Sequence, residues 1–221
     1  HLGQAFTLKA FNYSVDGVEA YAEAPTAVPP IITLPNGVKE YHQIQVPVAS
    51  ATTWNYHFIE SGPLKAYFFN PQHDLEIHPY GASDNFAGGR TFDYDQTFYM
   101  TPGTRYRFRN YHAGGGIWWS EYEFSPNVWK RATTSKDMGT GTLREATIGA
   151  ETSDEVYVES GRVTITEAKY HTPGGVWTGF CWDPTHVQRL TYQSYSRVGT
   201  CYPYPVNGLP SYSWYVEYKR Y

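Results

Sequence analysis

The chain of 221 residues contains little cysteine, and this shortage points to its compartment. Only Cys181 and Cys201 are present. A disulfide between them would constrain the unfolded chain by roughly 3 kcal/mol and would indicate an oxidising compartment. Two free buried thiols are the alternative. We expect the disulfide, and therefore a secreted, extracellular protein.

Charge is also scarce, and no stretch is strongly basic or strongly apolar. Charged residues make up 17% of the chain, and the formal net charge is −4. This balance gives no electrostatic footprint for nucleic acid or an anionic membrane, so both partners are excluded. No apolar run approaches the length of a membrane span, and no signal peptide is visible, so we expect a soluble, mature form. A homo-oligomer is left open.

Several familiar motifs are missing. The chain has no phosphate-binding glycine loop, no nucleophile elbow, no Cys-x-x-Cys pair and no zinc-binding helix motif. Helix signals are scarce, with residues 187–192 as the one weak candidate. The sequence therefore leaves open whether the protein is an enzyme, and any cofactor is unknown.

Aromatic residues, glycine and proline are abundant instead. The chain holds 21 Tyr, 7 Trp, 20 Gly and 15 Pro, a balance that favours half-buried strands and many turns. We predict an all-β protein, a jelly roll or β-sandwich, with residues 1–221 as a single β domain.

One stretch occurs twice. The segment YHAGGGIW at residues 111–118 returns as YHTPGGVW at residues 170–177. This self-similarity predicts an internal duplication, with repeated units at about residues 91–150 and 151–210.

Turn formers divide the predicted strands. Residues 6–12 and 19–23 read as a hairpin, and Asn36-Gly37 indicates a second hairpin with a type I′ turn. Ser61-Gly62-Pro63 predicts a turn. Residues 70–89 read as the longest loop and the best place for function, and residues 213–218 as the last strand.

Histidine and tryptophan supply the candidate site residues. Four of the eight histidines follow a tyrosine, and in residues 73–78 strand alternation would place Asp74, Glu76 and His78 on one face. If such side chains converge, they could bind copper, zinc, iron or manganese; otherwise they are surface residues. The candidate metal ligands are His1, His57, His73, His78, His112 and His171. Exposed tryptophans could stack on a carbohydrate or small-molecule ligand, and the candidates are Trp118, Trp119, Trp177 and Trp182.

Three stretches carry family resemblances. TPGTRYRFRN at residues 101–110 resembles the second cupin motif, and residues 155–166 are similar to the first, which implies a double-stranded β-helix in two halves; Tyr106, however, stands where the cupin ligand is histidine. The opening, residues 6–23, resembles secreted proteins of filamentous fungi. His1 is shared with copper-dependent polysaccharide monooxygenases, or is a cloning remnant.

These observations favour a secreted protein that binds carbohydrate or an extracellular surface through Trp and Tyr. The first alternative is a metal-dependent extracellular enzyme, either of the cupin type or an N-terminal-histidine copper oxidase acting on polysaccharide. The second alternative is a structural subunit of an extracellular assembly.

Overall fold

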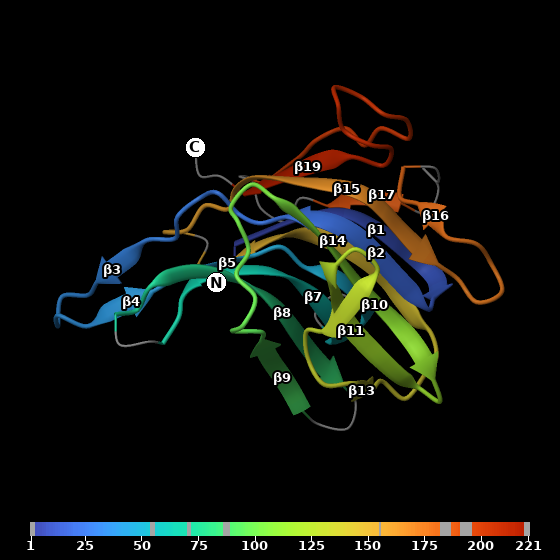
Figure 1. Ribbon diagram of the computed structural model, residues 1–221, viewed down its shortest axis with the longest axis horizontal. Helices are drawn as coiled ribbons and strands as arrows, with labels where there is room; N and C mark the ends of the chain where they lie inside the picture. Colours follow the sequence, from blue (N-terminus) through green and yellow to red (C-terminus); the bar gives the residue numbers. More distant parts are fainter. Residues whose placement is uncertain are drawn as a thin grey trace.

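The computed structural model describes residues 3–53, 56–69, 72–85, 89–154, 156–181, 187–190 and 196–218. These residues contain no helix, and nearly all of their strands lie in two antiparallel sheets that stack as a sandwich (Figure 1). The predicted all-β class is therefore confirmed. The weak helix candidate is wrong, because residues 187–190 form a strand.

The first sheet, sheet A, has eight strands. Its order is β17-β1-β14-β5-β7-β8-β9, and β6 lies between β14 and β7 beyond the end of β5. The strands are β1 (Gly3–Val15), β5 (Gln43–Gln45), β6 (Val48–Thr53), β7 (Tyr56–Tyr67), β8 (Leu75–Asn85), β9 (Gly89–Tyr94), β14 (Leu143–Thr152) and β17 (Val187–Leu190).

The second sheet, sheet B, has nine strands in the order β12-β11-β10-β2-β15-β19-β18, with β13 beside β11 and β16 beside β15. They are β2 (Gly17–Glu23), β10 (Arg105–Gly114), β11 (Ile117–Ser125), β12 (Val128–Arg131), β13 (Lys136–Asp137), β15 (Gly161–His171), β16 (Thr178–Gly179), β18 (Ser196–Val198) and β19 (Trp214–Tyr218). The last strand was predicted from the sequence and is confirmed.

Two hairpin predictions have different outcomes. β3 (Ile31–Thr33) and β4 (Lys39–Tyr41) do form a separate hairpin. Its turn has a positive φ at Gly37 but not at Asn36, so it is not type I′. The predicted hairpin of β1 and β2 is wrong: β1 pairs with β14 and β17, whereas β2 pairs with β10 and β15 in the other sheet.

The predicted turn at Ser61-Gly62-Pro63 and the predicted long loop at residues 70–89 are also wrong, because β7 and β8 run through them. A Cβ on Gly62 would lie 2.0 Å from the Val46 carbonyl oxygen, so this glycine permits a close strand approach rather than a turn. Pro63 and Pro79 face each other across β7 and β8.

Proline has no backbone N–H to donate. At Pro63 and Pro79, the side of the strand on which an N–H would lie faces an irregular part of the sheet. In an antiparallel strand, the N–H and C=O of one residue point to the same side. The Pro63 carbonyl accepts from Val46 N, where β5 gives way to β6, and the Pro79 carbonyl accepts from Asp95 N, beyond the end of β9. Neither proline therefore breaks a regular ladder.

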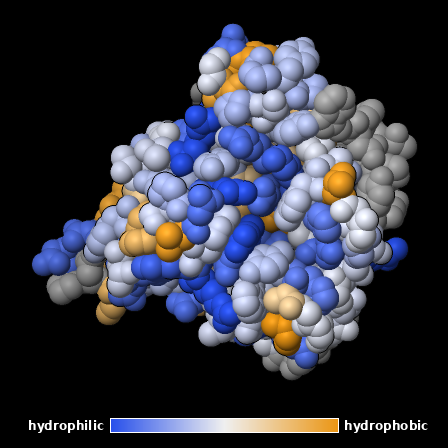
Figure 2. Space-filling model, turned by 45° about the vertical axis from the view of Figure 1, so that its right-hand side comes forward, coloured by the Kyte–Doolittle hydropathy of each residue, from blue (hydrophilic) through white to orange (hydrophobic). Residues whose placement is uncertain are grey.

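The main core lies between the sheets. Sheet A contributes Val48, Ile59 and Ile148, and sheet B contributes Phe108 and Trp118, all fully buried. The surface view in Figure 2 agrees, since hydrophobic residues form only small separate groups on a mostly hydrophilic face. Each sheet thus covers the apolar face of the other.

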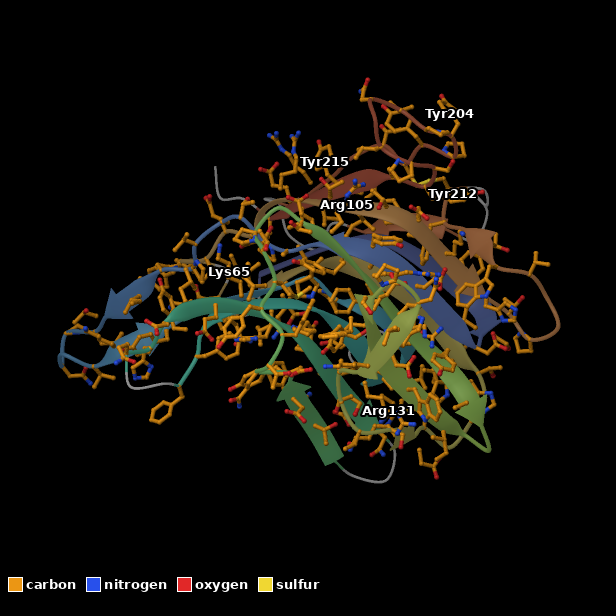
Figure 3. The ribbon with its side chains drawn as sticks, viewed as in Figure 1. Lys65, Arg105, Arg131, Tyr204, Tyr212 and Tyr215 are labelled. Carbon is orange, nitrogen blue, oxygen red and sulfur yellow. A yellow bond between two sulfur atoms is a disulfide. The ribbon has the colours of Figure 1, made fainter. Side chains whose placement is uncertain are left out.

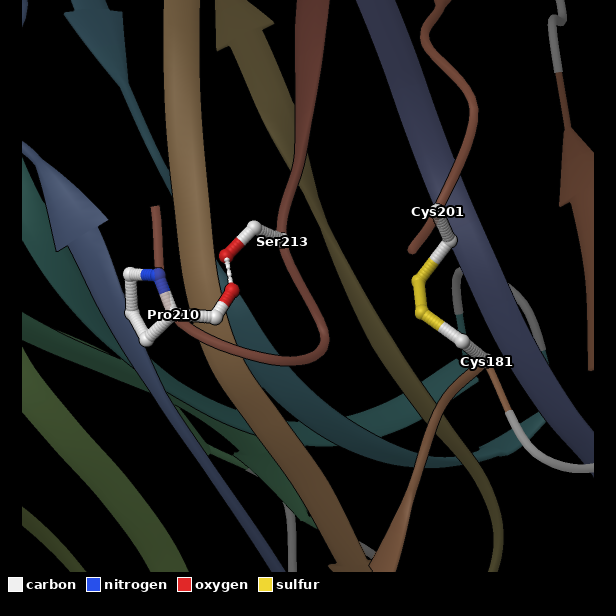
Figure 4. The surroundings of a disulfide bond; sticks show 4 residues. All are labelled: Cys181, Cys201, Pro210 and Ser213. Carbon is white, nitrogen blue, oxygen red and sulfur yellow. Dashed lines mark hydrogen bonds between the residues drawn. A yellow bond between two sulfur atoms is a disulfide. The ribbon is translucent and has the colours of Figure 1, made fainter. Parts of the chain in front are cut away.

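The predicted disulfide joins Cys181 to Cys201, with their Cα atoms 5.5 Å apart (Figure 4). Near it, the Ser213 hydroxyl donates to the Pro210 carbonyl just before β19. Lys65 of β7 is also buried, and its Nζ donates to the carbonyls of Pro25 and Thr26, both at 3.0 Å (Figure 3). Burial lowers the pKa of Lys65.

A polar bridge crosses the core between β10–β11 and β6–β7. Asn110 and Ser120 are both fully buried, and the Ser120 hydroxyl donates to Asn110 Oδ1. Asn110 Nδ2 donates to the Val48 carbonyl at 2.6 Å, and Ser120 Oγ lies 3.1 Å from the Glu60 carbonyl oxygen. The bridge fixes the backbone of two sheet A strands against sheet B.

We predict that Asn110→Ala lowers the free energy of unfolding by about 1–3 kcal/mol, because it leaves the buried Val48 carbonyl without its side-chain donor. Urea unfolding followed by tryptophan fluorescence measures the loss. Asn85→Ala is the matched control, since Asn85 makes a similar bond to the Asp137 carbonyl near the surface. Equal losses in the two variants would contradict the importance of the bridge.

Candidate active site

A row of paired residues crosses the face of sheet A that points away from the core. Directly paired residues share a face of an antiparallel sheet. Ile59 and Ile148 belong to the main core, so their neighbours Glu60 and Thr147 face the other way. The register joins Thr147, Ala49, Glu60, Ala82 and Phe92 from β14 to β9.

Alternation along β14 places two more carboxyls on this face. Glu145 and Glu151 lie two and four residues from Thr147, and Glu145 is buried. Glu151 is paired directly with Gln45 of β5. The outer face of sheet A therefore carries Glu60, Glu145, Glu151 and Gln45, supplied by three strands.

A buried aromatic residue contacts the carboxyl of Glu60. The Tyr80 ring is fully buried on β8, and its hydroxyl donates to Glu60 Oε1 at 3.2 Å. Leu64, Phe68, Tyr80 and Ala82 belong to a second apolar cluster, separate from the main core. The Glu60 side chain retains some exposed surface, so it lies where solvent can reach a mostly apolar setting.

This setting changes the acidity of Glu60. Burial raises the pKa of Glu60 from 4.5 to about 8, the negative charge of Glu151 adds to the rise, and the Tyr80 hydrogen bond opposes it. The pKa of Tyr80 is also well above its usual value, first through burial and then through the charges of Glu60 and Glu151. Glu60 therefore keeps its proton to a higher pH than an ordinary glutamate does.

The predicted histidine ligands lie in separate contacts, and the described part of the chain has no cluster of three or more His, Cys, Asp or Glu side chains that could hold a metal. His78 is buried, with Nε2 2.8 Å from Glu76 and Nδ1 3.0 Å from the Phe98 carbonyl. The predicted facing of Glu76 and His78 is thus observed.

The remaining histidines have other neighbours. His73 stacks on Tyr41, His57 Nδ1 lies 3.9 Å from Asp84, and His171 Nδ1 lies 2.5 Å from Asp16. His112 Nε2 accepts from the Gly116 amide. His1 lies outside the described residues. The metal-ligand assignment stays a prediction, and the structure does not bring these residues together.

The three candidate tryptophans that the structure describes all make intramolecular contacts. Trp118 is fully buried, and its indole donates to the Thr140 carbonyl at 2.9 Å. Arg131, labelled in Figure 3, lies with its guanidinium 3.9 Å from the centre of the Trp119 ring. Trp177 is 42% exposed but packs on His171. Trp182 lies outside the described residues.

The comparisons with known proteins agree with this architecture. No protein-family model and no curated protein matches the chain. Two crystal structures of scytalido-glutamic peptidase with transition-state analogues match with a TM-score of 0.57 at 9% and 10% identity, over 99% of this chain and 100% of theirs. SCP-B, a member of the Eqolisin family of peptidases, solved with the tripeptide Ala-Ile-His, matches with a TM-score of 0.54 at 9% identity over the same shares. At such identities the likeness shows the fold.

These matches correct the predicted functions. The carbohydrate-binding protein, the metal-dependent enzyme and the structural subunit are all wrong, because these whole-chain structural neighbours are peptidases. None of these three neighbours is a cupin, so the cupin resemblance gains no support from them. The division into one domain with repeated units stays a prediction. The described residues include no helix that is both long and apolar enough to span a membrane.

Sequence reasoning missed Gln45, Glu60 and Glu151. A signal for Glu60 was present, since a single acid follows the apolar pair Phe58 and Ile59. Such an acid shares the buried setting of its strand, where carboxyl pKa values rise.

We predict that the stability of the protein depends on pH through Glu60. Its pKa is higher in the folded chain, so the folded state holds a proton that the unfolded state releases between pH 4.5 and about 8. The free energy of unfolding should therefore fall across this window as pH rises, by at most about 1.4 kcal/mol per unit of pKa shift.

Glu60→Gln should remove this dependence, because the amide does not ionise and its oxygen can still accept from Tyr80. Urea midpoints should match the wild type near pH 4.5 and exceed it at pH 8.5. Glu40→Gln, at an exposed position, should follow the wild type throughout. If the urea midpoint of Glu60→Gln changed with pH in parallel with that of the wild type, the raised pKa of Glu60 would be refuted.

Proposed function

We propose that this protein is a peptidase that hydrolyses peptide bonds with a pair of glutamates, Glu60 and Glu151. The observation that carries the proposal is the presence of both carboxyls on one face of sheet A, where burial and the charge of Glu151 raise the pKa of Glu60 to about 8. Two carboxyls held in different protonation states can divide acid and base work between them. The whole-chain likeness to glutamic peptidases supports the same class of reaction.

Each of the two carboxyls has one role in the proposed reaction. The Glu151 carboxylate takes a proton from a water molecule, and the water oxygen forms a bond to the peptide carbonyl carbon. Glu60, as a neutral acid, donates a hydrogen bond to the carbonyl oxygen as negative charge develops there. The proton held by Glu151 then passes to the amide nitrogen, the C–N bond breaks, and a carboxylic acid and an amine are released.

Neighbouring side chains support these roles. Gln45 is the direct cross-strand partner of Glu151, so its amide lies within reach of the carboxylate or of the attacking water. Tyr80 occupies Glu60 Oε1 as a donor, which leaves Oε2 to carry the acid proton. The disulfide is compatible with an extracellular location, and we propose that the enzyme acts there.

We predict that Glu151→Gln lowers kcat/KM for peptide hydrolysis by about 100-fold or more, because the amide cannot accept the proton from water. The measurement is cleavage of a fluorogenic peptide library between pH 3 and 9. Glu145→Gln is the matched comparison on the same strand and face, and should keep more activity. The reverse ranking would move the base role to Glu145, and no cleavage by the wild type would refute the proposed function.

Glu60 variants test the second role. Glu60→Gln preserves a neutral hydrogen-bond donor, so it should keep activity within about 10-fold of the wild type and should not lose activity as pH rises through about 8, where wild-type Glu60 ionises. Glu60→Ala removes the donor and should lose about 100-fold or more. An inactive Glu60→Gln beside an active wild type would mean that Glu60 must transfer its proton.

A further inference from the structure

The strand β9 leaves one edge of sheet A open. Among the described residues, β9 pairs only with β8 and ends the strand order of its sheet (Figure 1). An unpaired strand edge can receive a further strand through main-chain hydrogen bonds. Such a strand would lie three strand spacings, about 14 Å, from β7, so its site would be separate from the Glu60 carboxyl.

The register shows which backbone groups face this open edge. The Asp95 amide donates to the Pro79 carbonyl at 3.0 Å, so every second residue counted back from Asp95 directs its N–H and C=O toward β8. Phe92 and Tyr94 therefore direct theirs outward. The Tyr94 amide lies 2.8 Å from Asp93 Oδ1, whereas the outward N–H and C=O of Phe92 have no hydrogen-bond partner among the described residues.

The two faces of β9 differ in character. Phe92 lies on the outer face of sheet A and is 49% exposed, with its ring centre 5.5 Å from that of Tyr80. Asp93 points to the other face, where a Cβ on its partner Gly81 would lie 2.8 Å from the Thr133 side chain. An added strand would therefore meet an aromatic ring on one face and a polar segment on the other.

A cavity of about 480 Å³ opens beside Asp93. It is lined by residues 93–95 and 131–135, so it lies between the end of β9 and the chain that leaves β12 at Arg131, which Figure 3 labels. Residues directly opposite each other in antiparallel strands share a face. The side chain of an added strand that lies opposite Asp93 would therefore point toward this cavity.

The charges around the cavity favour a cationic side chain. The exposed Asp93 carboxylate has no ion pair within the described part of the chain. The Asp95 carboxylate accepts from the Tyr122 hydroxyl. Arg131 also lines the cavity, but its guanidinium lies 3.9 Å from the centre of the Trp119 ring. Two carboxylates beside one guanidinium leave an excess of negative charge, which complements a Lys or Arg side chain.

We propose that the open edge of β9 binds an extended peptide segment as an added antiparallel strand, with a Lys or Arg side chain opposite Asp93 and an apolar side chain opposite Phe92. The Phe92 N–H donates to a carbonyl of the segment, and the Phe92 carbonyl accepts from an amide of the segment. This site goes beyond the proposed function, because binding there does not require the chemistry of the two glutamates.

Fluorescence anisotropy with a labelled peptide, Thr-Val-Lys-Val-Thr, tests the mode of binding. N-methylation of both valines should weaken binding by about 5-fold or more, because it removes the amides that would face β9. N-methylation of the lysine, whose amide would point away from β9, is the matched control and should change Kd by less than about 2-fold. The titrations use the full chain carrying Glu151→Gln, so that the peptide stays intact.

Variants of β9 test the same contacts from the side of the protein. Phe92→Pro removes the outward N–H without breaking the ladder to β8, so it should bind about 5-fold or more weakly than Phe92→Ala, which keeps the N–H. The unchanged β9 should prefer the Lys peptide over one with Glu in its place by about 3-fold or more, and Asp93→Asn should remove this preference. Thermal melts check that each variant folds.

The outcomes separate this site from the proposed function. No binding, equal effects of the two methylations, or equal affinities of Phe92→Pro and Phe92→Ala would overturn the site, and none of these results bears on peptide cleavage. The methylated peptides decide the question even if Phe92→Pro fails to fold. A dimer in light scattering that Phe92→Pro dissociates would assign the edge to a second copy of the chain, and would overturn the proposal as well.

Discussion

The polar bridge of Asn110 and Ser120 is the contact through which the two sheets fix each other's position. Packed apolar side chains alone tolerate small sliding motions, whereas buried hydrogen bonds have a narrow range of geometry. Ser120 lies against the carbonyl of Glu60, and Asn110 donates to the carbonyl of Val48, so the bridge holds β6 and β7 at the point where the sheet carries its central glutamate. The interior of the sandwich therefore positions a side chain that points to the opposite face.

Much of the fold could be predicted from composition, but strand partners could not. The aromatic and glycine content indicated an all-β sandwich, and the single cysteine pair indicated a disulfide. Glycine was a misleading turn signal at Gly62 and Gly81, where a Cβ would lie 2.0 Å from the Val46 carbonyl oxygen and 2.8 Å from the Thr133 side chain. A local turn signal does not distinguish a chain that turns from a chain that another strand approaches closely, since both favour glycine.

The repeated YH…W motif shows why similar segments acquire different roles. Tyr170 pairs with Val18, but in the first copy Asn110 pairs with Val18 and Tyr111 with Gly17. A one-residue shift of register moves each side chain to the other face. Tyr170 is therefore buried in the core, while Tyr111 lies beside Arg109 on the outside, with the Arg109 guanidinium 4.7 Å from its ring centre.

No local pattern could reveal how the members of the glutamate site come together, because they are far apart in the sequence. Gln45, Glu60 and Glu151 come from β5, β7 and β14, which neighbour each other only through the strand order of sheet A. The unusual acidity of Glu60 has the same origin: its burial depends on β8, and the charge that adds to its pKa shift comes from β14. The chemistry of the site is thus a property of the sheet order, and a sequence motif for it would have to span about half of the chain.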